Sequence, residues 1–401
     1  MISRRTHRPR VALLIESSRA YGRGLLRGVA RYVREHGRWS IFYQERRQGD
    51  HSPDWLDQWE GDGIIARVED RQMAQAIQRT GLPAVDLRGR FTDLGMPLIE
   101  TDDEEVVRLA VEHFRERGFR HFAYCGFPGA NYSDKREALL REHLRAAGHA
   151  CAVFVPPTPS AEGSTFELEQ QGFTHDEALA HWLKQLPQPT GLLCCNDIRG
   201  QHVLEICRRE GLAVPDELAV LGVDNDEVHC ELADPPLSSV ILHTEKIGYL
   251  AAEQLSRMME NTRAELVSSH RPIFVPPLGI AVRRSTDVLA MEDRSIAAAV
   301  RFIREHACEG IQVSDVLRAV PLSRSSLERR FMAALSRTPK EEILRVQLGR
   351  AKELLVETDF PLAEIAEKTG FKHPEYLSVI FKIKVGTTPG KFRAMKVGEV
   401  V

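Results

Sequence analysis

The chain changes its pattern of apolar residues near residue 290, and this change limits what it can fold into. From residue 10 to about 275, short runs of β-branched and aromatic residues alternate with amphipathic helical stretches. Such alternation is typical of βαβ units around a parallel sheet that is covered by helices on both faces. From residue 293 onward only helical spacing remains. The sequence thus predicts an α/β part followed by an all-α part.

The first part holds more strand–helix units than one small sheet needs, so we predict two doubly wound lobes with a cleft between them. The predicted strands are 11–16, 39–45, 61–66, 83–87, 97–101, 120–126, 191–195 and 218–225, and the predicted helices are 21–36, 72–80, 103–117, 133–147, 198–210 and 244–260. The predicted boundaries are a basic tail at 1–9, lobe 1 at about 10–118 and 240–275, lobe 2 at about 119–239 and 276–284, a linker at 285–293 and an all-α domain at 294–401.

Composition argues against several classes of protein. The seven cysteines include no CxxC pair, so neither a disulfide framework nor a zinc site is predicted, and no metal or other cofactor is expected. No apolar run approaches the ~20 residues that span a bilayer, so we expect no membrane partner. The basic N-terminus is not followed by an apolar signal core, which predicts a cytoplasmic protein.

The helical part repeats itself. Residues 313–339 and 362–389 share apolar positions at an offset of 49 and a trailing Thr-Pro at an offset of 50. Each copy has the pattern of a short helix, a tight turn and a second helix, which is the anatomy of a helix-turn-helix. We therefore predict two such motifs, at about 313–335 and 362–384, joined by a long helix at 340–356. The alternative is a plain helical bundle with coincidental similarity.

The second helix of each copy has an inward apolar face and an outward polar face. Leu327 and Phe331 point inward in the first copy, and Leu377 and Phe381 do so in the second. Arg can bind guanine with two hydrogen bonds, Glu can accept from cytosine, and Lys suits phosphate. The alternative for each charged residue is an ordinary solvated helix face. The candidate DNA-contacting residues are Arg324, Ser325, Glu328 and Arg329 in the first copy and Lys372, His373, Glu375, Ser378, Val379 and Lys382 in the second.

Charge is compatible with this prediction. Residues 291–401 contain 19 Lys and Arg against 15 Asp and Glu, whereas the remaining residues contain 35 against 42. A mildly basic end on an acidic body permits nucleic-acid binding without establishing it. Two helices held by one long helix would enter successive major grooves about 10 bp apart.

Polar side chains follow several of the predicted strands. Because the carboxyl ends of parallel strands border the cleft of open α/β lobes, we expect these side chains to meet there. Carboxylates, amides and a guanidinium suit a polyhydroxyl ligand, since they accept and donate hydrogen bonds to its hydroxyl groups. The candidate ligand-binding residues are Arg136 near a helix start, Asn196 and Asp197 after strand 191–195, Asp224 and Asn225 after strand residues 218–223, and Tyr21 and Arg23 after the first strand.

Two alternatives accompany these candidates. Asp197 precedes helix 198–210 and would also serve as an ordinary helix cap. The segment YGRGLLRG, with Gly22, Gly24 and Gly28, approximates a dinucleotide-binding fingerprint. Its first glycine does not directly follow the strand and its last spacing is one residue too long, so a nucleotide site stays only as an alternative.

The residues of the second repeat resemble the signature of the AraC/XylS transcription factors. The chain departs from the pattern at Leu377 and Phe392, which are usually Phe and Tyr, and at Val379, where a polar residue is common. The matching residues are Ile365 and Ala366, Gly370 and Phe371, Tyr376, Phe381 and Lys382, Gly386, Thr388 and Pro389, and Arg393.

The first part of the chain resembles the sugar-binding domains of the LacI/GalR regulators, which have a two-lobed periplasmic-binding-protein-like (type I) fold. CCNDIRG (194–200), VLGVDND (220–226) and Arg136 carry this resemblance. By the resemblance, Arg136, Asn196 and Asp224 match the family's sugar-contacting positions. The joined halves, with AYGRGLLRGVARY, PPLSSV, VPPL and RRSTD, are similar to the xylose-responsive regulators that combine both domains.

This resemblance implies a transcription activator of sugar-catabolism genes that is not an enzyme. It implies D-xylose as the effector, double-stranded promoter DNA and RNA polymerase as partners, and a homodimer. A regulator of another pentose or of a nucleoside stays open. So does a sugar-modifying or nicotinamide-dependent α/β enzyme, although no nucleophile–base pair or phosphate loop supports one.

Overall fold

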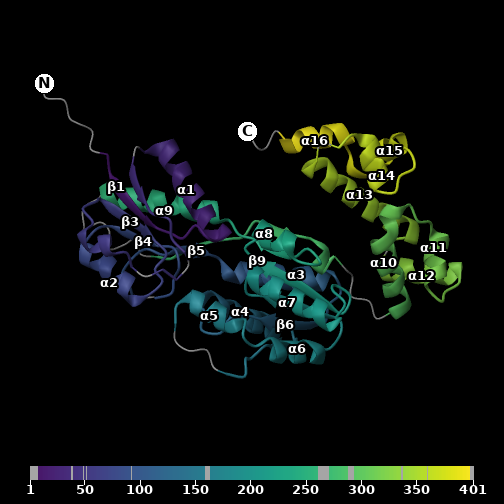
Figure 1. The fold of residues 1–401 in the computed structure, drawn as a ribbon, viewed down its shortest axis with the longest axis horizontal. Helices are drawn as coiled ribbons and strands as arrows, with labels where there is room; N and C mark the ends of the chain where they lie inside the picture. The colour runs from purple at the N-terminus through teal and green to yellow at the C-terminus, as the bar shows by residue number, and fades with distance from the viewer. Residues whose placement is uncertain are drawn as a thin grey trace. The chain divides into compact units, whose positions relative to one another are not determined.

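The chain divides into two compact units, Met1–Val288 and Leu289–Val401 (Figure 1). The computed structural model describes residues 8–37, 39–47, 49–50, 52–91, 93–158, 163–260, 271–287, 293–335, 337–358 and 360–397. The first unit is α/β and the second is all-α in these residues, which confirms the predicted fold class. None of the described helices is long and apolar enough to cross a membrane.

Lobe 1 of the first unit is built on a four-stranded parallel sheet. Its elements are β1 (Arg10–Leu14), β2 (Ser40–Tyr43), β3 (Gly63–Ala66), β4 (Ala84–Asp86), α1 (Ala20–His36), α2 (Arg71–Thr80), α9 (Thr244–Glu260) and the short 3-10 helix η1 (Asp54–Gln58). The strand order is β2-β1-β3-β4. Alternate residues of β1 pack on opposite faces: Val11 and Leu13 meet α1 and α9, whereas Ala12 and Leu14 meet α2 and η1. Burial on both faces explains the unbroken apolar run.

Lobe 2 is built on a six-stranded sheet in the order β12-β10-β9-β8-β6-β7, with β12 antiparallel to β10. Its strands are β6 (His121–Cys125), β7 (Cys151–Val153), β8 (Thr190–Cys194), β9 (Leu218–Val223), β10 (Ser238–Ile241) and β12 (Gly279–Ala281). Its helices are α3 (Asp103–Glu116), α4 (Asn131–Ala146), α5 (Thr165–Gly172), α6 (Asp176–Gln185), α7 (Asp197–Glu210), α8 (Glu227–Leu232) and the 3-10 helix η3 (Arg284–Thr286). A separate parallel pair, β5 (Ile99–Thr101) with β11 (Ile273–Val275), precedes two of the crossings between the lobes.

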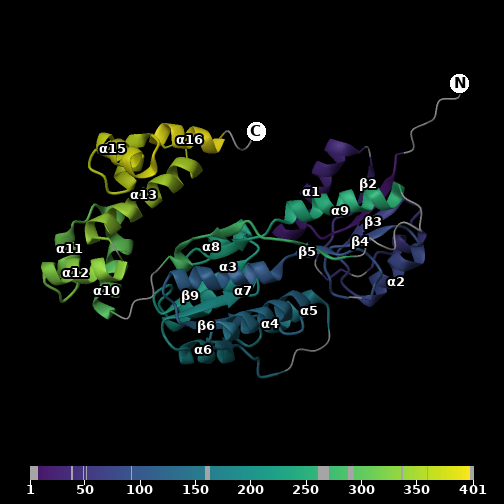
Figure 2. The same ribbon diagram turned by 180° about the vertical axis from the view of Figure 1, so that it is seen from behind.

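The predicted boundary of lobe 1 at residue 118 is wrong by one helix, because α3 belongs to lobe 2 (Figures 1 and 2). Its apolar face packs on the lobe 2 sheet, where a side chain at Gly191 would lie 2.7 Å from the Phe114 ring. Residues 240 and 241, predicted in lobe 1, lie in β10 of the lobe 2 sheet. The chain therefore crosses between the lobes at residue 102, at 242–243 and at 276–278.

The glycines of YGRGLLRG allow close packing. A Cβ at Gly22 would lie 1.9 Å from the Glu16 carbonyl oxygen, whereas Gly24 and Gly28 serve the packing of two helices. A Cβ at Gly24 would lie 1.9 Å from Thr244 Oγ1, and a Cβ at Gly28 would lie 2.0 Å from the Glu245 carbonyl oxygen. Both distances are far inside van der Waals contact, so only glycine lets α1 and α9 approach this closely; they lie side by side in Figures 1 and 2. This packing accounts for the glycine spacing without a nucleotide.

The second unit contains a pair of helix-turn-helix motifs. Its elements are α10 (Arg294–His306), the 3-10 helix η4 (Ala307–Glu309), α11 (Val313–Ala319), α12 (Arg324–Leu335), α13 (Pro339–Glu357), α14 (Leu362–Lys368), α15 (Pro374–Val385) and α16 (Pro389–Val397). The first motif is α11 and α12, the second is α14 and α15, and α13 joins them. The proline in α15 occupies the first helical turn, where its missing N–H leaves no hydrogen bond unmade.

A tight joint connects the two motifs at the middle of α13. Gln347 donates from Nε2 to the Ala307 carbonyl oxygen at 2.9 Å and approaches the Gly370 carbonyl oxygen at 3.5 Å. A Cβ at Gly370 would lie 2.6 Å from the Gly310 nitrogen, so the turn of the second motif rests on the backbone beside the first. Gly370 also has a φ of 75°, which favours glycine.

The predicted linker at 285–293 is wrong at both ends. Ser285 and Thr286 are fully buried in lobe 2, where Ser285 Oγ donates to the Val220 carbonyl oxygen at 2.6 Å. At the other end, Asp293 caps α10 and pairs with Arg330, whose Nε lies 2.6 Å from Asp293 Oδ2. Residues 288–292 lie outside the described residues.

Candidate functional site

A cavity of about 80 Å³ lies between the two lobes of the first unit, where the carboxyl ends of both sheets meet. Its walls are mostly polar, and both lobes contribute to them. The lining residues are Glu16, Arg19, Tyr21, Arg67, Leu87, Arg88, Glu100, Thr101, Asp103, Asn131, Tyr132, Arg136, Glu169, Asn196, Ile198 and Asp224. Four of the seven predicted ligand-binding residues are among them, namely Tyr21, Arg136, Asn196 and Asp224.

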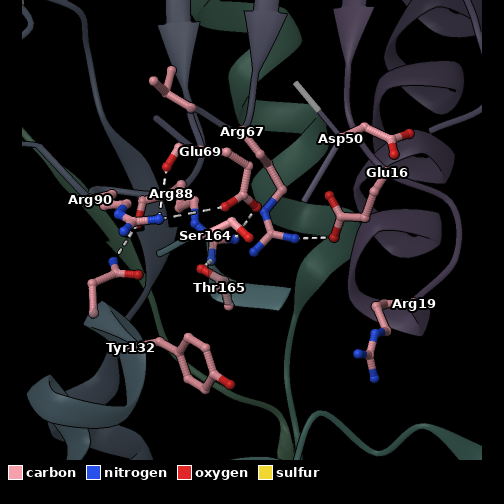
Figure 3. Close-up of polar contacts among 12 residues, drawn as sticks. Glu16, Arg19, Asp50, Arg67, Glu69, Arg88, Arg90, Tyr132, Ser164 and Thr165 are labelled. Atoms are coloured by element: carbon pink, nitrogen blue, oxygen red, sulfur yellow. Dashed lines mark hydrogen bonds and ion pairs between the residues drawn. The ribbon is translucent and has the colours of Figure 1, made fainter. Parts of the chain in front are cut away.

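The lobe 1 wall is formed by charged residues that follow its strands (Figure 3). Glu16 follows β1, Arg67 follows β3 and Arg88 follows β4. Arg67 forms an ion pair with Glu16, and Arg88 Nη1 lies 2.9 Å from Glu69 Oε1. The sequence prediction missed all four, of which Glu16, Arg67 and Arg88 line the cavity, although Arg67 and Arg88 directly follow predicted strands.

Tyr21 lies beside this wall as a neutral hydrogen-bonding group. Its hydroxyl lies 3.2 Å from Thr101 Oγ1, and the Arg67 guanidinium carbon lies 4.7 Å from the centre of its ring. Burial raises the pKa of Tyr21 to about 12, against the lowering effect of Arg67. The phenol therefore keeps its proton at neutral pH.

The lobe 2 wall is a connected network of buried polar side chains. Arg136 donates from Nε to Asp103 Oδ1 at 2.8 Å and from Nη1 to the Cys195 carbonyl oxygen at 2.5 Å. Asn196 donates from Nδ2 to the Tyr132 hydroxyl at 3.0 Å, and Tyr132 donates to Glu169 at 2.8 Å. Burial raises the pKa of Tyr132 well above its ordinary value, and nearby Glu169 adds to the increase. These contacts fix each side chain before a ligand arrives.

Asp224 differs from the other acids of the cavity because its carboxylate has no ion-pair partner among the described residues. Glu16, Asp103, Glu169 and Glu100 are paired with Arg67, Arg136, Arg19 and Lys135, respectively. Asp224 has only its backbone N–H bonded, to the Val240 carbonyl oxygen at 3.1 Å. Burial raises the pKa of Asp224, whereas Arg136 and Arg67 lower it.

The backbone at this position is unusual as well. Asp224 has a φ of 112° and Asn225 a φ of 52°, in a region that residues other than glycine seldom adopt. Strained backbone of this kind clusters at functional sites, where it directs a side chain that would otherwise turn away. The strain here places the free carboxylate of Asp224 in the cavity wall.

Further hydrogen-bonding atoms in the wall lack partners within the described part of the chain. They are Arg67 Nε, Arg88 Nε and Asn131 Oδ1, all of them buried. Buried polar atoms are nearly always hydrogen-bonded in native proteins, so atoms left open around one cavity indicate a ligand or water there. The set contains both donors and acceptors.

The remaining three predicted residues do not line the cavity. Asp197 points away from it, because its carboxylate accepts from Ser239 Oγ at 2.5 Å and from the Asp226 N–H at 2.7 Å. Burial and the neighbouring carboxylate of Asp224 raise the pKa of Asp197. Asp197 is the first residue of α7, and the helix is capped by Asn196, whose Oδ1 accepts from the Arg199 N–H.

Asn225 and Arg23 are held by other contacts. Asn225 Oδ1 accepts from Arg283 at 2.9 Å, which ties the strand end to the segment before η3. Arg23 donates to the Ser17 carbonyl oxygen at 2.9 Å and lies 3.8 Å from Asp226. These side chains support the loops around the cavity and do not form its wall.

Several contacts join the lobes around the cavity. Arg19 of lobe 1 pairs with Glu169 of lobe 2 at 2.8 Å. Arg90 donates to the Gly163 carbonyl oxygen at 2.7 Å, and the Ala20 N–H donates to Asp226 at 3.2 Å. The lobes are therefore closed on each other in this structure. No group of three or more His, Cys, Asp or Glu that could hold a metal occurs within the described residues.

In the second unit, α12 and α15 present the predicted DNA-contacting faces to solvent. Leu327, Phe331, Leu377 and Phe381 are fully buried, as predicted. Arg324 pairs with Glu328 at 3.1 Å in an exposed contact of the kind that exchanges readily. The exposed candidates are Arg324, Ser325, Glu328, Arg329, Lys372, His373, Glu375, Val379 and Lys382, and Ser378 is half-buried.

Three family models match the chain. They are an XylR N-terminal domain over residues 10–100, a periplasmic binding protein-like domain over residues 111–286 and a helix-turn-helix domain over residues 316–395. Together they follow the two-part architecture described above.

Full-length relatives have the same architecture. The chain is 33% identical to the xylose operon regulatory protein of Escherichia coli K12, with 97% of each chain covered. It is 32% identical to the xylose operon regulatory protein of Haemophilus influenzae, over 96% of this chain and 98% of the relative. The solved structure of a xylose-binding transcription activator, xylR, superposes with a TM-score of 0.76 at 32% identity, over 97% of this chain and 99% of that chain.

Proposed function

Since the chain belongs to the family of xylose operon regulatory proteins, we propose that it is a D-xylose-responsive activator of transcription that binds promoter DNA. In this proposal the cavity between the lobes holds the sugar, and α12 and α15 hold the DNA. The protein acts as a binding switch and carries out no chemical step on the sugar.

The unpaired carboxylate of Asp224 is the observation that carries the sugar assignment. A lone carboxylate attracts hydroxyl donors and repels anions, so it favours a neutral polyol over a phosphate or a carboxylic acid. Arg67 Nε and Arg88 Nε supply donors for the hydroxyl oxygens, and Asn131 Oδ1 supplies a second acceptor. Donors and acceptors on all sides are what a ring with a hydroxyl on most carbons requires.

The size of the cavity supports a single sugar ring. One buried water needs roughly 10–15 Å³ on the same measure, so the cavity has room for about five to eight waters. That volume suits a small ligand such as a single sugar ring. The fixed hydrogen bonds of Arg136, Asn196 and Tyr132 give the site a preset shape, which is how a pocket distinguishes sugars that differ at one hydroxyl.

Sugar binding would act by stabilising the closed arrangement of the lobes. The wall contains residues from both lobes, such as Arg67 and Asp224, so a ligand between them favours the state in which both are in reach. A ligand shifts such an equilibrium only by its preference for one state. We infer that the closed state of paired subunits binds the promoter and recruits RNA polymerase.

The test is a titration of the whole chain with D-xylose, L-arabinose and D-ribose by calorimetry, followed by promoter binding with and without each sugar. We expect heat of binding with D-xylose and tighter DNA binding in its presence. DNA binding without any sugar response would contradict the effector assignment. Sugar binding without DNA binding at any sugar concentration would contradict the proposal that the protein is a transcription regulator.

A further inference from the structure

The second recognition helix presents an apolar stripe to solvent. Tyr376, Val379 and Ile383 of α15 are 51%, 56% and 67% exposed. They lie at helical spacing on one side of α15, opposite the buried Leu377 and Phe381. Contiguous exposed apolar side chains on a soluble protein mark a site of interaction.

The two motifs can be compared residue by residue. Leu327 and Leu377 are both fully buried, and so are Phe331 and Phe381, which sets an offset of 50 between α12 and α15. At this offset Val379 takes the place of Arg329. With about 100° of rotation per residue, Val379 lies about 180° from the direction midway between Leu377 and Phe381. It is therefore the residue of α15 that points most directly outward.

Basic residues lie at both ends of α15. Lys372 and His373 precede α15, and Lys382 and Lys384 stand in its last turn, against a single acid, Glu375. A helix of 10–12 Å diameter occupies the full width of a major groove of about 12 Å, so its two ends come close to phosphates of both strands. This charge pattern matches DNA and does not match a neutral or basic protein surface.

We propose that α15 recognises thymine, with Val379 packed against the 5-methyl groups of thymine in the major groove and Tyr376 and Ile383 extending the apolar contact. The thymine methyl is the apolar mark that the major groove offers, whereas guanine and adenine offer polar edges. The inference rests on the proposed DNA binding. The two recognition helices then differ in kind: α12 recognises polar base edges through Arg329, and α15 recognises methyl groups.

The test begins by selecting duplexes from a random pool with the full chain and D-xylose. Thymines in the half-site covered by α15 are then replaced one at a time by deoxyuridine, which removes the methyl and keeps every hydrogen bond. We expect a three- to fivefold loss of affinity at one or two positions, the change for one buried methyl group. No comparable loss should occur in the half-site covered by α12.

Variants distinguish a thymine contact from a contact with another protein. Val379→Ala should lose the preference for thymine over deoxyuridine at the position that Val379 contacts. Val379→Thr, which keeps one of the two valine methyls, should retain part of that preference, and Arg329→Ala should keep it fully. Equal affinity of the parent for thymine and deoxyuridine would overturn the inference while leaving DNA binding intact. So would a Val379→Ala variant that loses transcription but not DNA affinity, since the stripe would then contact protein. Failure to select any duplex would instead overturn the proposed function.

Discussion

Replacement of Asp224 by Asn removes the unpaired charge of the cavity and keeps the size of the side chain. Asn tolerates a positive φ at least as well as Asp, so the backbone at 112° should be retained, as it would not be with Ala. A hydrogen bond to a charged group contributes about 1.5–3 kcal/mol, and its loss should raise the Kd for D-xylose roughly 10- to 150-fold.

Calorimetry and thermal unfolding measure this change independently. At a sugar concentration of about 100 times the parent Kd, bound ligand stabilises the parent by about 2.7 kcal/mol. At the same concentration, the stabilisation is about 1.4 kcal/mol for a variant that binds tenfold more weakly and about 0.4 kcal/mol for one that binds a hundredfold more weakly. The matched control is Glu227→Gln, the same chemical change at an exposed position three residues later. If Asp224→Asn binds D-xylose within twofold of the parent, the reasoning about the unpaired carboxylate is wrong.

The same variant tests the pH dependence of binding. Burial raises the pKa of free Asp224, and a sugar hydroxyl that donates to the ionised form should lower it. Binding therefore releases protons, and affinity should fall as the pH drops through the pKa of the free protein. Asp224→Asn should bind with less dependence on pH, and its calorimetric heat should vary less with the ionisation enthalpy of the buffer.

The remaining predictions concern the DNA-binding unit and the fold. Arg329→Ala should relax base preference at one position by about 1–3 kcal/mol, whereas Arg330→Ala, which breaks an ion pair, should lower stability and leave the preference unchanged. Gly28→Ala should destabilise the fold to urea by about 1–3 kcal/mol because of the clash with α9, whereas Gly349→Ala, with nothing within 4 Å, should not. Burial, helped by Arg117, lowers the pKa of His113 from 6.5 to about 3. Neutral His113 therefore contributes fully to the free energy of unfolding above pH 6.5, and this contribution is lost as the pH falls toward 3, by up to about 1.4 kcal/mol per pH unit. His113→Gln should flatten the slope of unfolding free energy against pH. An unchanged slope would contradict this prediction.

The positions of the predicted strand ends selected several residues that line the cavity. The direction of each side chain, however, depends on partners that are distant in the sequence. Asn196 and Asp224 line the cavity, whereas Asp197, next to Asn196, turns away from it. Asp197 is held by the Ser239 hydroxyl and the Asp226 amide, which are 42 and 29 residues away. Nothing near Asp197 in the sequence distinguishes it from a ligand-facing acid.

The lobe 1 wall could have been found by the same argument from strand ends. Arg67 and Arg88 follow predicted strands as directly as Asn196 does, and the strand-end rule applied there would have selected them. The lobe to which α3 belongs was harder to predict from the sequence. The apolar spacing of α3 suits either lobe. Tertiary contacts assign the helix to lobe 2, such as the packing of Phe114 against Gly191 and the 2.8 Å contact between His113 Nε2 and Thr286 Oγ1.

The joint at Gln347 makes the pair of helix-turn-helix motifs a bivalent ligand of fixed geometry. Because the turn at Gly370 rests on the backbone of Gly310, docking of α12 delivers α15 to its groove at high effective concentration, with little orientational freedom left to lose. A rigidly joined pair of motifs can bind DNA whose second half-site has low affinity, but not DNA whose second half-site is displaced. One inserted base pair turns the second groove by about 34–36° around the DNA axis, given the 10–10.5 bp repeat, and a rigid joint cannot follow it. The spacing of a promoter's half-sites would then be under stronger constraint than the bases within the weaker one.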